Sequence, residues 1–558
     1  MTRPWLVLAL TLLCGAGARA DDWEDTRRFW ESEGQADALT SRTRAFDRLA
    51  RASDAKGLPL LQERYKSPRA PHPEEERFLI AGALRWASAT PAARQALEGW
   101  VRALKGRDPW LESNAMAVLE AAQLLTLVKD PKEEAWRRAA AAQVLAANHL
   151  VGEVVPGLSS ALAPEALPRK ERDLALLAGG FGAALIQLQV RLQNDPDAPG
   201  DGELEPLLTA LLGVRAHKKL PAPARALLER RLARFSAVRG QLEAEEQALD
   251  PDAGGTRLAA RKAPASFVGI TVQDRERIVY VVDLSDSMLA PLTREESERL
   301  REASRPRTGD QGTSPRGGAD NQEGAQPALP WDRIRTRFDA ARELLLLSLR
   351  ELEPGTRFAV VVFGDEAALL RSTPRLVEAG AQSLAAVSAE MRAIQPGAAS
   401  AGRPNGTLRG QTNLHAAVRL AWQVSTKGVL SPAECASWKN PSETLADTVF
   451  LLSDGAPTRD DFKGLGPARE HQAGTVTRTD PETGATTTSE TEAGVSSQEL
   501  EGPYRDLEYF QRDLERLNLF RWTQLHVVGL GECDERWGRL LSRLGEGELE
   551  IVGGKAGD

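Results

Sequence analysis

The sequence predicts an α plus α/β protein, with an N-terminal all-α region followed by a doubly wound, mainly parallel α/β sheet. From about residue 22 to 250, apolar residues recur at three- and four-residue spacing with almost no β-branched runs, which is typical of helices. Residues 250–266 are rich in Pro, Gly and charge and are predicted to be a linker. After the linker, short continuous apolar runs alternate with amphipathic helices, the pattern of parallel strands covered on both faces.

Residues 1–20 are predicted to be a secretory signal peptide. Arg3 precedes a nine-residue apolar run, and small residues form a cleavage-site pattern that ends at Ala20. The apolar run is too short to cross a bilayer. Leu13 stands before Cys14, where a lipoprotein signal needs a small side chain. We therefore expect cleavage after Ala20 and a soluble exported protein, periplasmic or extracellular.

The charge of the chain gives no sign of a nucleic-acid partner. The sequence has 71 Lys and Arg against 79 Asp and Glu, a net charge of −8 that becomes −10 when the signal peptide leaves with its two arginines. This acidic charge is diffuse, and no basic tract stands out. No second long apolar segment is evident, so we expect no integral membrane span. The high content of Ala, Arg and Gly suggests a bacterial envelope protein.

The all-α domain is predicted over residues 21–249, and its helices come in pairs. Residues 41–67 predict a helix, a short turn and a second helix, and comparable pairs begin near Glu75 and near Glu134. Pairs that repeat every few tens of residues indicate an α-solenoid of stacked helical hairpins. The first and third pairs resemble degenerate HEAT repeats, and the alternative is an irregular helical domain.

The α/β domain is predicted over residues 267–558. Its strands are four apolar, β-branched runs at 278–282, 358–363, 448–452 and 525–530. Between the first two runs we expect a helix with Asp332 as its N-cap and an apolar stripe from Ile334 to Leu352. Further helices are predicted at 383–394, 413–424, 503–517 and 534–544. Strands and helices that alternate in this way imply right-handed crossovers in a doubly wound sheet.

Oxygen-bearing side chains follow three of the predicted elements. Asp283, Ser285 and Ser287 leave the first strand, Thr412 stands at the start of a helix, and Asp454 ends another strand. Ligands of doubly wound sheets collect at the carboxyl ends of the strands, so these segments are expected to converge on one edge. For the first stretch alone, three interpretations compete: an ordinary polar strand end, a serine nucleophile, or half of a metal site.

The chemistry of these side chains favours a metal site. Two carboxylates and three hydroxyls are hard oxygen donors, which suit Mg²⁺ or Mn²⁺. Softer metals are poorly served, because the six histidines are scattered and neither Cys435 nor Cys533 has a neighbour at zinc spacing. We expect the two cysteines at opposite ends of the sheet and therefore as free thiols, beyond the roughly 7 Å reach of a disulfide. With few charged ligands, a bound ion keeps exchangeable positions, and a partner's carboxylate could fill one.

Together these motifs resemble the metal-ion-dependent adhesion site of a von Willebrand factor type A domain. The DxSxS motif that begins at Asp283, Thr412 within GQTNL, and Asp454 within LLSDGAPT occur in the family's order, and the likeness covers about residues 264–556. The resemblance implies Mg²⁺, or else Mn²⁺ or Ca²⁺, with Asp283, Ser285, Ser287, Thr412 and Asp454 as ligands, the last often through a water. We therefore expect a non-enzymatic, metal-dependent protein-binding module whose ligand carboxylate completes the metal shell.

Four residues adjoin the expected site: Asp286, Gly410, Asn413 and Gly455. Asp286 stands between the two serines, where the family frequently has Gly. It either adds negative charge beside the metal or is a solvent-facing residue. Gly410 and Asn413 flank the site threonine, and Gly455 turns the chain after the site aspartate.

The three connections that bear the site carry long insertions, at about residues 289–331, 395–410 and 459–503. Their low complexity predicts that they form no core of their own. Neutral insertion into surface loops is one explanation, because long loops are thermodynamically cheap. Our alternative hypothesis is that an acid of an insertion, such as Glu295, Glu296 or Asp460, fills the metal's open position and inhibits binding.

Two other functions stay open at this point. One is a structural scaffold whose ion only stabilises loops, and partner binding that survives EDTA would favour it. The other is a hydrolase that uses Ser285, although neither serine lies in a GxSxG elbow and His415 is expected to pack against the sheet. The chain has no GxxxxGK[ST] phosphate loop, so a role beside an ATPase has no support within it.

Overall fold

The computed structural model contains two compact units, residues 1–243 and residues 244–558. The predicted signal peptide and most of the predicted linker lie outside the described residues. The described residues are 23–552 apart from 37–38, 53–54, 70–72, 88–89, 105, 195–200, 236–237, 239–264, 269, 273–275, 304–328, 398–409, 440–443, 456, 458–473, 480–485, 492–506 and 532.

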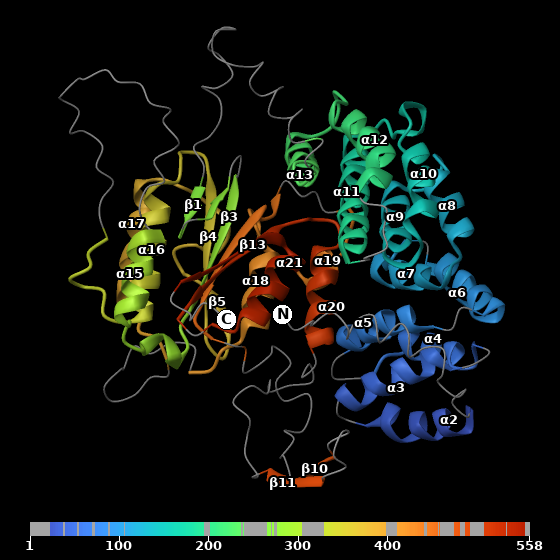
Figure 1. Cartoon of the computed structure of the whole chain (residues 1–558), viewed down its shortest axis with the longest axis horizontal. Helices are drawn as coiled ribbons and strands as arrows, with labels where there is room; N and C mark the ends of the chain where they lie inside the picture. The colour runs from blue at the N-terminus through green and yellow to red at the C-terminus, as the bar shows by residue number, and fades with distance from the viewer. Residues whose placement is uncertain are drawn as a thin grey trace. The chain divides into compact units, whose positions relative to one another are not determined.

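The N-terminal unit is helical over its described length, as the periodicity predicts (Figure 1). Its α-helices are α2 (Trp23–Ser32), α3 (Leu39–Arg51), α4 (Leu58–Lys66), α5 (Pro73–Ala83), α6 (Pro91–Leu104), α7 (Pro109–Ala115), α8 (Ala121–Lys129), α9 (Ala135–Asn148), α10 (Val151–Ala161), α11 (Glu171–Asn194), α12 (Glu205–Arg215) and α13 (Ala222–Leu232). Short 3₁₀ turns join several of them.

These helices stack in two layers. In one layer α3, α5, α7, α9, α11 and α13 each contact the next, and in the other α8 contacts α10 and α10 contacts α12. Neighbours in sequence, such as α8 with α9, pack as hairpins between the layers. Buried Arg138 ties one hairpin to its surroundings, because its guanidinium donates to the carbonyls of Val128, Ala161 and Ala166. This arrangement is the stacking of helical hairpins that the paired pattern indicates.

Helix α11 is a second long apolar segment, which the sequence analysis did not identify. By length and composition, its stretch Glu171–Gln193 is apolar enough to cross a membrane. Within the described chain, however, 67% of this apolar window is buried, and α11 packs against α9 and α13. A helix that is hydrophobic on most sides is also what the centre of a helical stack requires.

The C-terminal unit contains the predicted parallel sheet, which confirms the predicted fold class. Strands β3 (Arg277–Asp283), β4 (Arg357–Phe363), β9 (Thr448–Ser453), β12 (Gln524–Leu530) and β13 (Glu546–Val552) pair in parallel, in the order β13-β12-β9-β3-β4. Short β5 (Ala367–Leu369) and β6 (Val377–Glu378) pair antiparallel with β4. Counted along the chain, the order reverses beside β3, so the switch point of a doubly wound sheet lies between β3 and β9.

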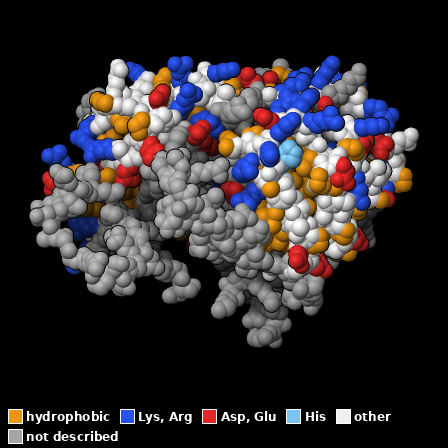
Figure 2. Space-filling model, turned by 90° about the horizontal axis from the view of Figure 1, so that it is seen from above, with side chains coloured by type: hydrophobic (Ala, Val, Ile, Leu, Met, Phe, Trp, Pro, Cys, Tyr) orange, Lys and Arg blue, Asp and Glu red, His pale blue; other side chains and the backbone are white. Residues whose placement is uncertain are grey.

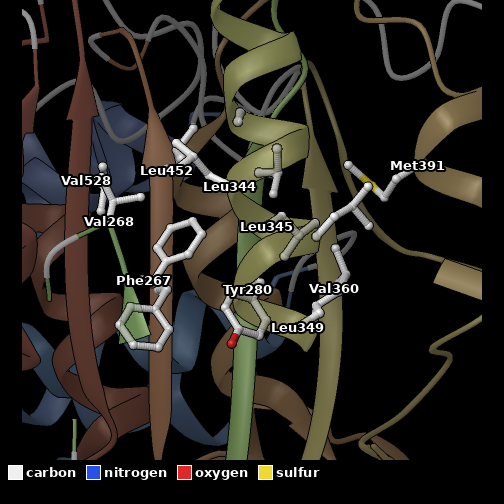
Figure 3. Close-up of a cluster of buried hydrophobic side chains, with 14 of the residues drawn as sticks. Phe267, Val268, Tyr280, Leu344, Leu345, Leu349, Val360, Met391, Leu452 and Val528 are labelled. Carbon is white, nitrogen blue, oxygen red and sulfur yellow. The ribbon is translucent and has the colours of Figure 1, made fainter. Parts of the chain in front are cut away.

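Helices cover both faces of this sheet (Figure 1). They are α16 (Arg337–Arg350), α17 (Ala381–Ala393), α18 (Leu414–Gln423), α20 (Leu507–Asn518) and α21 (Glu535–Leu544). On one face Tyr280 packs with Leu345, Leu349 and Val360, as Figure 3 shows. The opposite face buries Val281 and other alternate residues of β3 against α18, α20 and α21. Because each face is covered, every residue of β3 is buried, which explains its unbroken apolar run.

One predicted helix start is wrong. Helix α16 begins at Arg337 with Thr336 as its N-cap, whereas the sequence suggested Asp332. The Thr336 hydroxyl accepts a hydrogen bond from the backbone N–H of Asp339, and the Asp339 carboxylate accepts one from the N–H of Thr336. This reciprocal capping box satisfies two backbone donors at the start of the helix.

The remaining elements are short, and several lie in the insertions. Two antiparallel hairpins are β1 (Ala265–Phe267) with β2 (Ile270–Val272) and β7 (Val424–Ser425) with β8 (Gly428–Val429). Helix α19 (Pro432–Cys435) follows the second hairpin. The first insertion contains α15 (Arg294–Ala303), and the third contains the hairpin β10 (Gly474–Thr479) and β11 (Thr486–Thr491). Helix α15 contributes buried Leu300 to the sheet's core, so this part of the first insertion packs on the sheet.

Candidate metal-binding site

The DxSxS segment and Asp454 meet because their strands are neighbours. β3 and β9 pair in parallel with Val282 opposite Leu452, so both chains leave the sheet at the same edge. The Ser285 and Ser287 hydroxyl oxygens are 3.0 Å apart, and Ser287 Oγ donates to Asp454 Oδ1 over 2.7 Å. The backbone N–H of Ser285 donates to Asp283 Oδ1 over 2.7 Å. Four predicted ligands therefore form one hydrogen-bonded cluster.

The fifth predicted ligand, Thr412, is held beside this cluster by the loop that follows β4. Buried Asp365 accepts a hydrogen bond from the backbone N–H of Gln411 (2.9 Å), and its carbonyl accepts one from Asn413 Nδ2 (3.0 Å). The Asn413 side chain also caps α18, since its Oδ1 accepts from the N–H of Ala416. Thr412 is 5% exposed.

Gly455 marks where Thr412 and Ser287 come together. A β-carbon added at Gly455 would lie 3.7 Å from Thr412 Oγ1 and 3.8 Å from Ser287 Oγ. Both hydroxyls therefore face the turn that follows Asp454. All five predicted ligands thus gather at the carboxyl ends of β3 and β9 and at the start of α18.

Asp286 is exposed, which agrees with the solvent-facing interpretation of this residue. Its backbone N–H donates to the carbonyl of Gly410 over 3.0 Å, and its side chain crosses the Gly410 backbone. A β-carbon at position 410 would lie 2.1 Å from Asp286 Oδ2, so glycine permits this close approach. Asp286 therefore joins the first site loop to the loop that carries Thr412.

Two buried carboxylates give the cluster its charge. The side chains of Asp283 and Asp454 are essentially inaccessible to solvent. Burial, and then the negative charge of Asp454, raise the pKa of Asp283 above its ordinary value. Hydrogen bonds from Ser285 and from the Ser453 hydroxyl, 2.5 Å from Asp283 Oδ2, partly offset this. Paired acids in a low-dielectric site favour a bound cation.

Arg337 adjoins the site, although sequence reasoning did not place it there. Its Nη1 donates to Asp454 Oδ2 over 2.9 Å, and its Nη2 and Nε donate to Glu296 Oε1 over 2.9 and 3.2 Å. Burial disfavours the charge on Arg337, but its bonds to Asp454 and Glu296 outweigh this and raise its pKa. A single arginine at the first position of a helix carries no local signal for such a role.

The structure overturns one part of the self-inhibition hypothesis and leaves the rest a prediction. Glu296 is already engaged elsewhere, because it is 2% exposed and its two carboxylate oxygens bind Arg337 and the N-terminus of its own helix. Its position follows from the capping box with Thr293, which local sequence could have indicated. Glu295 is exposed on α15, and Asp460 lies outside the described residues.

The donor set fits a hard divalent cation. Two carboxylates and three hydroxyls converge, and oxygen donors of this kind are those that Mg²⁺, Mn²⁺ and Ca²⁺ prefer. Within the described ranges, no group of three or more His, Cys, Asp or Glu side chains is arranged to hold a metal. The candidate site therefore depends on its hydroxyls and is short of the charged ligands that tight, zinc-like sites use.

His415 and the cysteines lie in other surroundings. His415 is fully buried, and its Nε2 is 2.9 Å from Asp513 Oδ2 on α20. Asp513 also pairs with Arg516 and Arg419, which, despite burial, hold its pKa well below the usual range. Cys435 and Cys533 are both free thiols, as expected.

Comparison with known proteins adds little to this geometry. No protein-family model matches the chain, and no curated protein matches it significantly. Among solved structures, one match is a von Willebrand factor type A protein from Catenulispora acidiphila, with a TM-score of 0.26 and 15% identity. That match covers 50% of this chain and 39% of the other. So distant a likeness supports no conclusion about function.

Proposed function

We propose that the C-terminal unit is a non-enzymatic protein-binding module whose binding depends on a divalent metal, Mg²⁺ or else Mn²⁺ or Ca²⁺. The observation that carries the proposal is the hydrogen-bonded cluster of Asp283, Ser285, Ser287 and Asp454, with Thr412 beside it. These five residues would hold the ion. When bound, the ion supplies positive charge and an exchangeable position that a carboxylate of a protein ligand can fill.

The residues of the chain preorganise this site in three ways. The Ser285 N–H and the Ser453 hydroxyl bond both oxygens of Asp283 and fix its carboxylate plane. The loop around Asp365 positions the segment that carries Thr412. Burial by the strands on either side removes water from the two carboxylates, which strengthens any charge interaction there.

The proposal extends to the setting of the molecule. The signal-peptide pattern supports an exported protein, periplasmic or extracellular, after cleavage near Ala20. The helical unit would act as a second docking surface or as a spacer. We propose no nucleic-acid partner: the acidic chain has no basic tract, and on the face in Figure 2 basic side chains mix with acidic and apolar ones.

Two measurements on the full chain test the proposal. The first is the melting temperature in Mg²⁺ and in EDTA, for the wild type and for Asp283→Ala. An ion at 100 times its dissociation constant would stabilise the fold by about 2.7 kcal/mol. We therefore expect the wild type to melt at a higher temperature in Mg²⁺ than in EDTA, and the Asp283→Ala variant to melt at the same temperature in both. Equal melting temperatures in Mg²⁺ and EDTA, together with no Mn²⁺ binding by calorimetry, would refute the metal site.

The second measurement separates binding from scaffolding. The immobilised chain is offered an envelope extract in Mg²⁺, and bound proteins are then released with EDTA. We expect a protein that EDTA releases and that Asp283→Ala does not retain. Retention that is the same in Mg²⁺ and EDTA contradicts a metal-dependent binding module.

A structural scaffold is the second candidate, and one observation favours it. Arg337 already supplies Asp454 with a buried counter-charge, so the site holds together through the chain's own residues. A scaffold would bind metal and gain stability, yet its partner binding would not respond to EDTA. A hydrolase using Ser285 is the third candidate, and loss of ester turnover in Ser285→Ala would be its test. We assign no catalytic residue.

A further inference from the structure

We infer that Arg337 is a built-in counter-ion of the candidate metal site, which holds Asp454 in the metal-free protein and lowers the affinity for divalent cations. This inference rests on the proposed function. It identifies a residue that sets how strongly the site binds its ion, and it gives a role to the inserted helix α15, which carries Glu296.

The contacts of Asp454 are the first step. Its Oδ2 accepts from Arg337 Nη1 over 2.9 Å, and its Oδ1 accepts from Ser287 Oγ over 2.7 Å. The Asp454 side chain is 0% exposed and that of Arg337 is 14% exposed. Both carboxylate oxygens are thus engaged by the chain itself, and the fixed positive charge lies one hydrogen bond from a predicted metal ligand.

The second step concerns the contacts that hold the Arg337 side chain in place. Glu296 Oε1 accepts from two nitrogens of the guanidinium, while Glu296 Oε2 accepts from the N–H of Thr293 and so caps α15. Glu296 is therefore held by its own helix and by Arg337 together. Because α15 also buries Leu300 in the core, the inserted segment presents this carboxylate from a fixed position.

The backbone at Gly531 lies against the ion pair of Arg337 and Glu296. Gly531, at the end of β12, has φ of +61°, and a β-carbon there would lie 2.3 Å from Arg337 Nη2 and 2.5 Å from Glu296 Oε1. The ion pair thus fits against a position that has no side chain. Because the guanidinium is enclosed in this way, its positive charge stays in a fixed position beside Asp454.

Removing the charge of Arg337 and removing the charge of Glu296 should change the metal affinity in opposite directions. A fixed cation beside the site repels a divalent ion, so removal of the Arg337 charge should strengthen metal binding. Removal of the Glu296 charge leaves Arg337 less neutralised and should weaken metal binding. An ion pair with a purely structural role predicts instead that both variants destabilise the fold and impair the site in the same direction.

The test measures Mn²⁺ affinity of the full chain by calorimetry, for the wild type, Arg337→Met and Glu296→Gln. We expect the dissociation constant to fall at least about tenfold in Arg337→Met, which corresponds to about 1.4 kcal/mol, and to rise in Glu296→Gln. Arg342→Met is the matched control, because Arg342 lies on the same helix and pairs with Asp339 and Glu343. Its Mn²⁺ affinity should equal that of the wild type.

Melting temperature provides a second readout. In EDTA, Arg337→Met should melt below the wild type, because Asp454 and Glu296 lose their counter-charge, and Mn²⁺ should restore more stability to it than to the wild type. If Arg337→Met does not fold, Glu296→Gln carries the test. Unchanged or tighter Mn²⁺ binding in Glu296→Gln would then overturn the inference.

The outcomes distinguish this inference from the proposed function. Mn²⁺ binding by the wild type that Asp283→Ala abolishes, with unchanged or weaker binding in folded Arg337→Met, overturns the inference and leaves the metal site standing. Absence of Mn²⁺ binding in the wild type and in Arg337→Met overturns both.

Discussion

The substitution Gly531→Ala is the most direct test of the enclosed ion pair beside the candidate site. Gly531 is buried and has φ of +61°, a conformation that costs an alanine roughly 1 kcal/mol. Its added β-carbon would also fall 2.3 Å from Arg337 Nη2 and 2.5 Å from Glu296 Oε1. Contacts this short cannot persist, so the ion pair must shift or separate, or the end of β12 must move.

The expected magnitude follows from these two effects. An extra methyl group in a filled site costs about 1–3 kcal/mol, because the ends of the Arg337 and Glu296 side chains must shift to make room for it. Together with the cost of the positive φ, we therefore expect Gly531→Ala to lower the free energy of unfolding by about 2–4 kcal/mol in total. Gly355→Ala is the matched control, because Gly355 also has positive φ (+88°) but no atom within 4 Å of its added β-carbon. It should cost only about 1 kcal/mol.

The assay is urea unfolding of the full chain with pulsed hydrogen exchange, measured by mass spectrometry on peptides from β9 and β12. Peptide resolution is needed because the chain has two compact units, and a single transition would not separate them. Equal destabilisation by Gly531→Ala and Gly355→Ala would contradict a tightly enclosed ion pair, because the added methyl group at position 531 would then meet no resistance.

Three further predictions concern other parts of the chain. Burial raises the pKa of Glu112 to about 7 from 4.5, so the helical unit should lose stability as pH rises through this interval, and Glu112→Gln should abolish that slope in pH-dependent melting. The depressed pKa of Asp513 means that its stabilisation is present above its unfolded pKa and is lost as pH falls. At neutral pH, Asp513→Asn should cost about 3–5 kcal/mol in urea unfolding, and a cost below about 1 kcal/mol would contradict the buried network. Burial raises the pKa of Cys533, to about 12, and that of Cys435, so both thiols should react with Ellman's reagent slowly until urea unfolds the protein. Fast reaction of the native protein would contradict the burial of Cys435 and the raised pKa of half-buried Cys533.

The fold class was predictable because it depends on local patterns. The apolar run that became β3 has no polar interruption, and the structure buries it on both faces. The paired helical pattern of the first region likewise corresponds to stacked hairpins. Helix starts were less predictable: Asp332 and Thr336 are both acceptable N-caps by residue type, and the reciprocal bond with Asp339 decides for Thr336.

The candidate site was predictable in its members and not in its surroundings. Asp283 ends β3, Asp454 follows β9, and Thr412 precedes helix α18, which packs on the same sheet, so the α/β topology was enough to bring them together. Ser453 lies next to Asp454 in the LLSDGAPT motif, yet its bond to Asp283 depends on the pairing of β9 with β3. A short stretch of sequence cannot indicate this contact, because it does not say which strands are neighbours in the sheet.

The sequence by itself determined the two regions of different class, the strands of the sheet, and the oxygen-bearing residues at its carboxyl edge. These features follow from periodicity and from the residue types that end a strand, which act over a few neighbouring positions. Only the tertiary structure decided that Arg337 binds Asp454 and Glu296 under Gly531. Those residues come from four segments, and the packing of an inserted helix brings them together, so no short stretch of sequence contains the information.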